Sequence, residues 1–342
     1  MESSALNTFL TNMPKVELHI HLEGSIPFKA LWELVKKYNG QDEVRDIDEM
    51  KKRFVFKDFP HFIETWIWKN KFIREYEDFT FIASETANDL KSQNIKYAEM
   101  FYSPSDFKDK GLTPSGITGA VSKGLKSVEG IKINLVTDLI RDFGPENAMR
   151  VLEEINEIRN PSILGIGIGG SEHSFPPAPF MKVYEKARSF GLKTSVHAGE
   201  AAGSESIWDA LKILKADRIG HAARAYEDES LINYLKEKQI PLEMCPLSNV
   251  RTGVVNSIEN HPVKEYYQKG LKVFLNTDDP KMFHNTLSEE YTMFIEKMGF
   301  DIIDVKKLVH NAIDSAWCSE DEKNALRIEI NNYFQINTLN IN

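Results

Sequence analysis

The chain has 342 residues and a formal net charge of −9, from 42 Lys and Arg against 51 Asp and Glu. Hydrophobic residues make up 42% of it and charged residues 27%, which is typical of globular proteins and excludes a disordered or fibrous chain. Because basic residues are not in excess, we expect neither a nucleic acid polymer nor an anionic membrane surface as a partner.

Cysteine content and hydropathy indicate the compartment. Cys245 and Cys318 are too few for a disulfide framework and fit a reducing environment. The first residues lack the basic and apolar segments of a signal peptide, and no apolar run approaches the length of a membrane span. We therefore expect a cytoplasmic protein. No linker-like segment interrupts the chain, which favours a single domain over residues 1–342; no pattern predicts an oligomeric state.

Short apolar runs rich in β-branched residues alternate with longer amphipathic segments. The runs predict strands at 16–22, 95–101, 133–140, 163–168, 193–197, 217–221, 241–245 and 272–276. Helical periodicity is clearest at 148–158, 179–190 and 229–238. Eight such β/α units predict an α/β fold of the (β/α)8 TIM barrel type.

The longest gap between predicted strands, about residues 27–94, predicts a helical insertion after the first strand. It contains the segment FPHFIETWIWKNKF at 59–72, with the aromatic residues Phe59, Phe62, Trp66 and Trp68. These aromatics could pack helices against the barrel. They could instead form a lid, because a loop after a barrel strand lies at the catalytic end.

Potential metal ligands cluster at the ends of predicted strands. They are His19 and His21 on the first strand, His197 on the fifth, His221 on the sixth, and Asp278 and Asp279 after the eighth. Alternation along a strand puts His19 and His21 on one side, so both can share an ion. Two neighbouring buried carboxylates need a cation to limit their repulsion. Imidazole and carboxylate ligands suit zinc first, and iron or another divalent ion second.

One nucleotide-binding pattern is present but lacks the required context. Gly165, Gly167 and Gly170 satisfy GxGxxG after a strand, yet the proline-rich segment SEHSFPPAPF follows instead of a helix. A dinucleotide site needs a helix N-terminus there. We interpret these glycines as allowing a ligand to approach bare backbone. Cys245 has no basic neighbour that would activate it, and we interpret it as a core residue.

Five motifs resemble those of the adenosine/adenine deaminase family in the amidohydrolase superfamily. In chain order they are PKVELHIHLEGS at 14–25, SVHAGE at 195–200, RIGHA at 218–222, CPLSN at 245–249 and NTDDP at 276–280. The resemblance implies a zinc-containing barrel enzyme with one ion per chain. It also implies that His19, His21, His197 and Asp278 hold that ion. The reaction would be hydrolysis of the 6-amino group of a small purine nucleoside or base.

The resemblance also implies roles in catalysis and binding. Glu200 corresponds to the group that transfers a proton to purine N1, and His221 to the residue that helps to deprotonate and hold the attacking water. Asp279 corresponds to the partner of N7. Gly170 stands where a backbone N–H meets N3. Glu23 stands where an acidic residue can bond the ribose 5′-hydroxyl.

These implications lead us to expect deamination of adenosine or 2′-deoxyadenosine to inosine or 2′-deoxyinosine. The segment IGGSEHSFPP at 168–177 also resembles relatives that act on adenine or aminodeoxyfutalosine, so the same chemistry on those substrates is the alternative. A non-catalytic purine-binding protein is a more remote one. Such a protein would be expected to lose Glu200 or a metal ligand, and none is missing.

Overall fold

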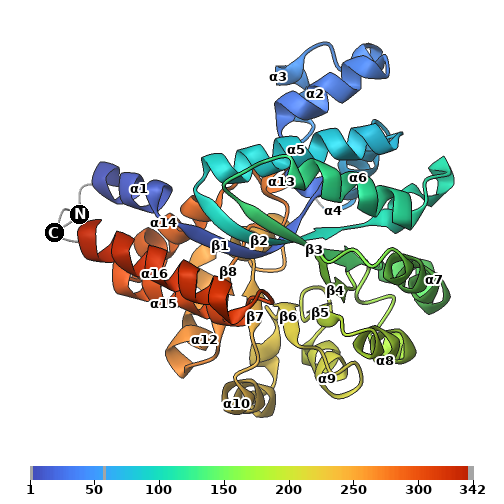
Figure 1. Ribbon diagram of the computed structural model, residues 1–342. Coiled ribbons are helices and arrows are strands. Elements are labelled where there is room, and N and C mark those ends of the chain that lie inside the picture. Colours follow the sequence, from blue (N-terminus) through green and yellow to red (C-terminus); the bar gives the residue numbers. More distant parts are fainter. Residues whose placement is uncertain (1–2, 57–58, 338–342) are drawn as a thin grey trace.

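The computed structural model describes residues 3–56 and 59–337 and confirms the (β/α)8 barrel. Eight strands form one sheet in the order β1 to β8, with helices around them (Figure 1). Their bounds are β1 Lys15–His21, β2 Ile95–Tyr102, β3 Lys132–Asp138, β4 Ile163–Gly167, β5 Lys193–Ala198, β6 Arg218–His221, β7 Leu242–Met244 and β8 Val273–Leu275. Each lies at a predicted position.

Neighbouring strands pair in parallel throughout the sheet. The first and last strands meet through backbone hydrogen bonds of Asp278, just beyond β8. His21 N–H donates to Asp278 O at 2.9 Å, and Asp278 N–H donates to His19 O at 3.1 Å. The closure of the barrel therefore runs through the predicted metal ligands themselves.

Outer helices cover the barrel with their apolar faces. On α7 the buried residues Ala148, Val151, Leu152 and Ile155 recur at helical spacing, as the sequence pattern predicts. The helices outside the insertion are α1 Ser3–Asn12, α6 Pro114–Lys126, α7 Gly144–Glu157, α8 Met181–Ser189, α9 Ser204–Lys212, α10 Glu229–Lys238, α11 Pro246–Arg251, α12 Val263–Lys269, α13 Pro280–Phe283, α14 Leu287–Met298, α15 Ile302–Ser315 and α16 Glu320–Asn337.

The barrel interior contains a buried ion-pair network as well as apolar side chains. The Arg218 guanidinium lies 2.6 Å from a carboxylate oxygen of Glu99 on β2 and 2.6 Å from one of Glu243 on β7. All three side chains are essentially inaccessible to solvent. Breaking such a buried pair by removing one partner typically costs 3–5 kcal/mol, about the amount expected for Arg218→Met in this network.

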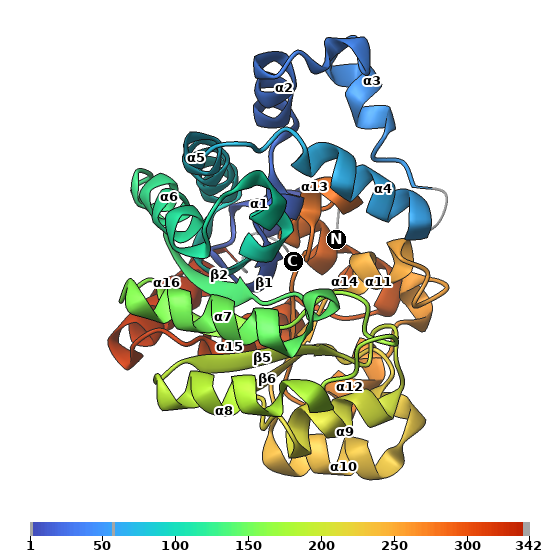
Figure 2. The same ribbon diagram turned by 90° about the vertical axis from the view of Figure 1, so that its right-hand side faces the viewer.

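The segment between β1 and β2 is helical, as predicted. It contains α2 Phe28–Lys37, α3 Ile47–Lys52, α4 Phe59–Asn70 and α5 Tyr76–Ser92. Helices α2 and α3 project from the barrel, whereas α4 lies beside α13 (Figure 2). The rings of Phe62 on α4 and Phe283 on α13 are stacked with centroids 5.5 Å apart. Helix α4 thus lies over the end of the barrel where β8 terminates.

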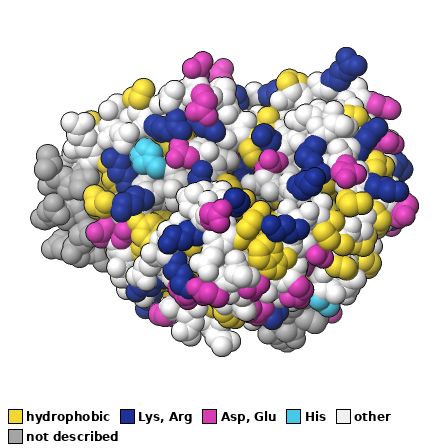
Figure 3. Space-filling view, turned by 90° about the horizontal axis from the view of Figure 1, so that it is seen from below, with side chains coloured by type: hydrophobic (Ala, Val, Ile, Leu, Met, Phe, Trp, Pro, Cys, Tyr) yellow, Lys and Arg dark blue, Asp and Glu magenta, His cyan; other side chains and the backbone are white. Residues whose placement is uncertain are grey.

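The molecular surface carries both signs of charge. On the face shown in Figure 3, Lys and Arg side chains are interspersed with Asp and Glu, and no basic stripe crosses that face. Among the residues that the structure describes, no helix combines the length and apolar character that crossing a membrane requires.

Candidate metal centre and adjoining pocket

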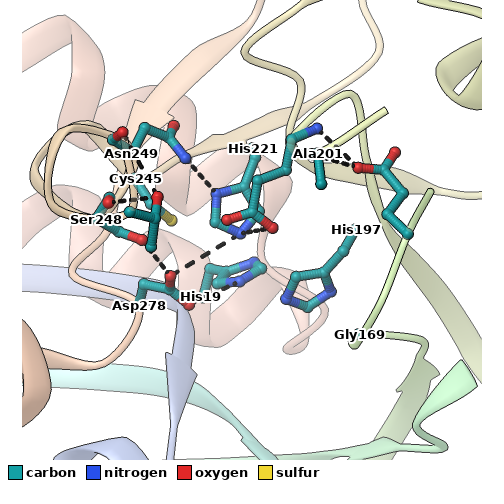
Figure 4. Close-up of polar contacts among 12 residues, drawn as sticks. His19, Gly169, His197, Ala201, His221, Cys245, Ser248, Asn249 and Asp278 are labelled. Carbon is teal, nitrogen blue, oxygen red and sulfur yellow. Dashed lines mark hydrogen bonds and ion pairs between the residues drawn. The ribbon is translucent and has the colours of Figure 1, made fainter. Parts of the chain in front are cut away.

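The predicted ligands converge at the carboxyl ends of the strands. His19 and His21 project from β1, His197 from β5 and His221 from the last position of β6, while Asp278 follows β8 (Figure 4 shows His19, His197, His221 and Asp278). The strands are parallel, so their carboxyl ends meet at one end of the barrel. This is why residues as far apart in the chain as His19 and Asp278 come together.

The side-chain atoms lie at distances that a shared cation would bridge. Asp278 Oδ1 lies 3.4 Å from His19 Nε2 and 3.3 Å from His21 Nε2. His21 Nε2 and His197 Nε2 are 3.2 Å apart. Ligand atoms of His19, His197, His221 and Asp278 all lie within 4.8 Å of one another. Four imidazoles and one carboxylate therefore surround the centre, one more group than a four-coordinate ion needs.

The orientation of His19 suits a metal ligand. Its Nδ1 lies 2.7 Å from Glu243 Oε2, and its Nε2 is buried without a hydrogen-bond partner in the described part of the chain. Ser195 Oγ–H donates to the same oxygen of Glu243 at 2.9 Å. A carboxylate that holds one ring nitrogen and leaves the other free is the usual support for a metal-binding histidine. The donor set therefore fits zinc.

Electrostatics favour positive charge at this centre. Burial acts to lower the pKa of His19, but the neighbouring carboxylates of Asp278 and Glu243 outweigh burial and raise that pKa to about 10. The same opposition, with Asp278 as the main partner, raises the pKa of His21 to about 9. A divalent cation would satisfy the same negative potential and would displace those protons.

Backbone strain marks two of these residues. His221 has φ 62° and Asp278 has φ 66°, both in the left-handed region that non-glycine residues seldom adopt. Each such conformation costs on the order of 1–3 kcal/mol and persists where surrounding contacts impose it. The barrel closure at Asp278 is one such contact. The chain thus accepts strain to aim two polar side chains at one point.

A cavity of about 390 Å³ adjoins the candidate metal centre. Its size lies in the range of small-molecule sites. It is lined by His21, Phe62, Ile63, Trp66, Ser103, Asp106, Asp138, Ile140, Asp142, Phe143, Gly169, Gly170, Ser171, His197, Glu200, His221, Thr252, Asp278, Asp279 and Phe283. The predicted residues Phe62, Trp66, Gly170, Glu200 and Asp279 are therefore all in the lining.

The aromatic residues of α4 divide between pocket and core. Phe62 and Trp66 are partly buried and line the cavity, and Trp66 Nε1–H donates to Asp106 Oδ2 at 3.1 Å. Trp68 is buried and donates to Glu43 at 2.9 Å, so it packs as a core residue. The side chain of Phe59 lies outside the described residues. Whether α4 moves as a lid stays a prediction.

Glu23 is not in the lining of this cavity. Its side chain is buried, and Oε1 accepts the backbone N–H of Ser103 at 3.0 Å. Ser103 itself lines the cavity. Contact between Glu23 and a ribose hydroxyl stays a prediction.

Two carboxyl groups in the lining have strongly raised pKa values. Glu200 Oε2 lies 3.5 Å from His221 Nε2, and its side chain is 23% exposed. Burial, then the negative charges of Asp278 and Glu172, raises the pKa of Glu200 to about 8. Burial, then Asp278, raises the pKa of Asp279 to about 7. A raised carboxyl pKa beside a metal centre indicates a group that can donate a proton at neutral pH.

Glycine is required at two positions around these groups. A Cβ on Gly24 would lie 1.7 Å from Asp279 Oδ1, so the β1 loop can approach that carboxyl only as bare backbone. Gly170 has φ 101°, and a Cβ there would lie 2.0 Å from Asp142 Oδ2. No acceptor in the described ranges takes the Gly170 N–H. That donor is available to a ligand in the cavity.

Glu172 holds the loop that carries Glu200, a role that motif reading missed. Its carboxylate accepts four backbone N–H groups, from Gly199 at 2.6 Å, Glu200 at 3.0 Å, Ala201 at 2.7 Å and Ala202 at 2.9 Å. Figure 4 shows such a contact at Ala201. The signal available in the sequence was the acidic residue two positions after Gly170. Glu172 therefore joins the Gly170 turn to the Glu200 loop.

Comparison with known proteins agrees with these features. The family model described as "Adenosine deaminase" matches residues 14–333. An adenine deaminase of Crocosphaera subtropica is 32% identical over 95% of this chain and 100% of its own length. An aminodeoxyfutalosine deaminase of Streptomyces avermitilis is 32% identical over 96% of this chain and 93% of its own. An adenosine deaminase of Clostridium perfringens is 31% identical over 94% and 99%.

Solved structures extend the likeness to three dimensions. An amidohydrolase from Burkhoderia ambifaria with bound zinc has a TM-score of 0.89 and 26% identity, covering 98% of this chain and 94% of that one. Arabidopsis ADAL complexed with IMP has a TM-score of 0.85 and 25% identity, covering 94% and 97%. Both solved structures share the fold of this chain, and the names of the three relatives above specify different purine compounds.

Proposed function

This chain belongs to the adenosine deaminase family, and we propose that it catalyses hydrolytic deamination of adenosine and 2′-deoxyadenosine. The net reaction consumes one water molecule and releases ammonia, leaving inosine or 2′-deoxyinosine. The observation that carries the proposal is the position of Glu200. Its carboxyl group has a pKa of about 8 and lies beside His221 at a metal-binding cluster.

We assign His19, His21, His197 and Asp278 as ligands of one zinc ion. The free Nε2 of His19 and the close approach of His21 to His197 support this set. When bound, zinc supplies a Lewis acid that makes water nucleophilic near neutral pH. We do not assign His221 as a ligand. Its Nε2 lies 3.5 Å from Glu200 Oε2, and we assign it to hold the attacking water.

The remaining lining residues bind and activate the purine. A protonated Glu200 donates to N1, which draws electron density from the ring and makes C6 more open to attack. Asp279 is buried with Oδ1 unpartnered and has a pKa of about 7, so its carboxyl group can be protonated and donate a hydrogen bond to N7. The Gly170 N–H bonds N3. Three hydrogen bonds to three ring nitrogens orient C6 toward the metal centre and disfavour any other orientation of the purine in the pocket.

The lining supports a substrate without a phosphate group. It includes the carboxyl groups of Asp106, Asp138 and Asp142, and no Lys or Arg is among the described residues of the lining. Acidic side chains repel a dianion, whereas they accept hydrogen bonds from ribose hydroxyls. We therefore propose nucleosides as substrates, in contrast to the IMP that the Arabidopsis structure contains.

Adenine and aminodeoxyfutalosine are the alternative substrates. Relatives bearing those names match this chain as well as adenosine deaminases do. Glu23→Ala tests the sugar end. Loss of a ribose contact should weaken adenosine by about 1–3 kcal/mol and leave adenine nearly unaffected. Equal losses on both substrates would assign Glu23 to support of the pocket wall near Ser103.

The deciding experiment measures ammonia release by metal-replete protein from adenosine, 2′-deoxyadenosine, adenine, aminodeoxyfutalosine and AMP. We expect kcat/KM for adenosine to exceed that for AMP by at least about 10-fold, or 1.4 kcal/mol. Asp142→Asn should narrow this gap, and Asp109→Asn, an exposed change outside the lining, should not. Higher activity on adenine than on adenosine would overturn the substrate assignment. Purine binding without ammonia release would indicate a non-catalytic protein.

A further inference from the structure

A chain of buried polar groups lies behind His221 on the side away from the cavity. Asn249 Nδ2 lies 3.0 Å from His221 Nδ1, and His261 Nε2 lies 3.1 Å from Asn249 Oδ1. The backbone N–H of Val263, the first residue of α12, donates to His261 Nδ1 at 3.3 Å. Figure 4 shows the Asn249 amide directed at the His221 ring. None of these three side chains is more than 2% exposed.

The direction of these hydrogen bonds is set by the Val263 N–H. A backbone N–H can only donate, so His261 Nδ1 is the acceptor and the proton of neutral His261 is on Nε2. That N–H needs an acceptor, and within residues 3–56 and 59–337 the one at hydrogen-bond distance is Asn249 Oδ1. The amide NH2 must then face His221. Reversing any one link would place two donors or two lone pairs against each other in a buried site.

The charge state of His261 agrees with this direction. Burial, and then the neighbouring His221, lowers the pKa of His261 to about 3. The groups that contact its ring are the Asn249 amide and the Val263 N–H, both uncharged. A neutral ring has one donor and one acceptor, which is what the chain of bonds requires.

We propose that Asn249 and His261 are positioning residues that hold His221 as the Nε2–H tautomer. The lone pair of His221 is then on Nδ1, where Asn249 occupies it. The Nε2–H points to the cavity, 3.5 Å from Glu200 Oε2 and 3.9 Å from Asp278 Oδ2. His221 therefore enters the reaction as a hydrogen-bond donor that holds the attacking water, and it does not take up the proton of that water at Nε2, unlike the role that the resemblance implies. In this tautomer it has no lone pair at Nε2 for a metal ion.

The proposal decides whether His221 is a metal ligand or a hydrogen-bond donor to the attacking water. His221 belongs to the group of four whose ligand atoms lie within 4.8 Å, together with His19, His197 and Asp278. Its ring differs from that of His19, whose Nδ1–H faces a carboxylate that accepts a hydrogen bond. A carboxylate behind Nδ1 frees Nε2 as a ligand, whereas an amide NH2 behind Nδ1 makes Nε2 a donor. The group that contacts Nδ1 of each ring therefore makes His19 a metal ligand and His221 a hydrogen-bond donor.

Histidine tautomers can be measured directly by long-range ¹H–¹⁵N NMR of metal-replete protein labelled at histidine. His221 is assigned from the signals lost in His221→Gln. We expect an unprotonated Nδ1 and a protonated Nε2. An Nδ1–H ring or a doubly protonated ring at neutral pH would overturn the proposal. This measurement needs no substrate, so its result does not depend on the proposed deaminase activity. The kinetic test below does rest on that proposed function.

Asn249→Asp tests whether Asn249 affects catalysis through His221, because it keeps the shape of the side chain and removes the N–H donor to His221 Nδ1. We expect the His221 signals to lose the Nε2–H pattern, and kcat to fall about 10- to 100-fold, the range for supporting contacts at metal sites. KM and zinc content should stay within about twofold of the parent protein, since Asn249 touches neither substrate nor metal. The same exchange at exposed Asn260 should change nothing.

Rescue distinguishes positioning from simple packing. His261→Gln retains an N–H donor toward Asn249 and should keep most of kcat, whereas His261→Leu removes it and should lose as much as Asn249→Asp. Equal losses in His261→Gln and His261→Leu would overturn the proposal. So would an Asn249→Asp protein whose His221 spectrum matches that of the parent.

Discussion

Glu172→Gln is the most informative single change outside the cavity lining. The Glu172 carboxylate accepts four backbone N–H groups, and its Oε2 alone accepts three, from residues 200–202. A glutamine can keep one oxygen toward those three groups. The Gly199 N–H would then face the amide NH2, donor against donor. The substitution preserves the volume of the side chain and changes only its hydrogen bonding.

The magnitude follows from these contacts. A hydrogen bond to a charged group contributes about 1.5–3 kcal/mol and one to a neutral group about 0.5–1.5, so each of the three retained bonds loses about 1 kcal/mol. The unpaired Gly199 N–H adds about another 1 kcal/mol. The loop that carries Glu200 is therefore disfavoured by about 3–4 kcal/mol. If all of this free energy disfavours the loop position that catalysis requires, the rate falls by about 10²- to 10³-fold.

The assay compares kcat, KM and zinc content of Glu172→Gln with those of the parent protein. We expect a large loss of kcat with zinc retained, because the proposed ligand His197 precedes the affected loop. Exposed Glu185 on α8 offers a matched control, and Glu185→Gln should behave as the parent. Combining Glu172→Gln with Glu200→Gln should add little further loss, since both act through the same carboxyl. Fully additive losses would refute the reasoning.

Other predictions test the metal, the proton donor and the aromatic helix. Elemental analysis should find one equivalent of zinc per chain, and His19→Ala should lose it; two ions at full occupancy would contradict the site. For the parent protein, kcat/KM should fall as pH rises through about 8, because only the protonated Glu200 can donate to N1. Glu200→Gln should lose at least about 10²-fold in kcat with zinc unchanged, and normal turnover would exclude Glu200 as the acid. On α4, Trp66→Ala should raise KM and alter preference among N9 substituents, whereas Trp68→Ala should lower Tm by several degrees through loss of about 3–5 kcal/mol of packing. Unaltered substrate ratios in Trp66→Ala would remove the lid from consideration.

The barrel and its strands were predictable from sequence because local patterns determine them. A buried parallel strand is rich in apolar and β-branched residues, and helices must alternate with it, so each of the eight strands left a local signal. The helix at 229–238 has the predicted bounds. The helix predicted at 179–190 begins instead at Met181, after a 3-10 turn at Ala178–Phe180.

The identity of the candidate site was also accessible to sequence, for a topological reason. Parallel strands all end at the same edge, so His19, His197 and Asp278 could be placed together without knowledge of side-chain packing. The same reasoning does not reach the groups behind them. Glu243 lies 224 positions from His19, and neither position predicts the 2.7 Å contact between their side chains.

The sequence by itself thus determined the fold, the family and the end of the barrel where chemistry occurs, because each depends on local pattern or on strand direction. Only the tertiary structure decided which neighbour each polar atom meets. It turned Glu23 toward the Ser103 backbone, gathered four N–H groups on Glu172, and placed an amide behind His221. Hydrogen-bond direction depends on distances of tenths of an ångström between distant segments, and no spacing along the chain contains that information.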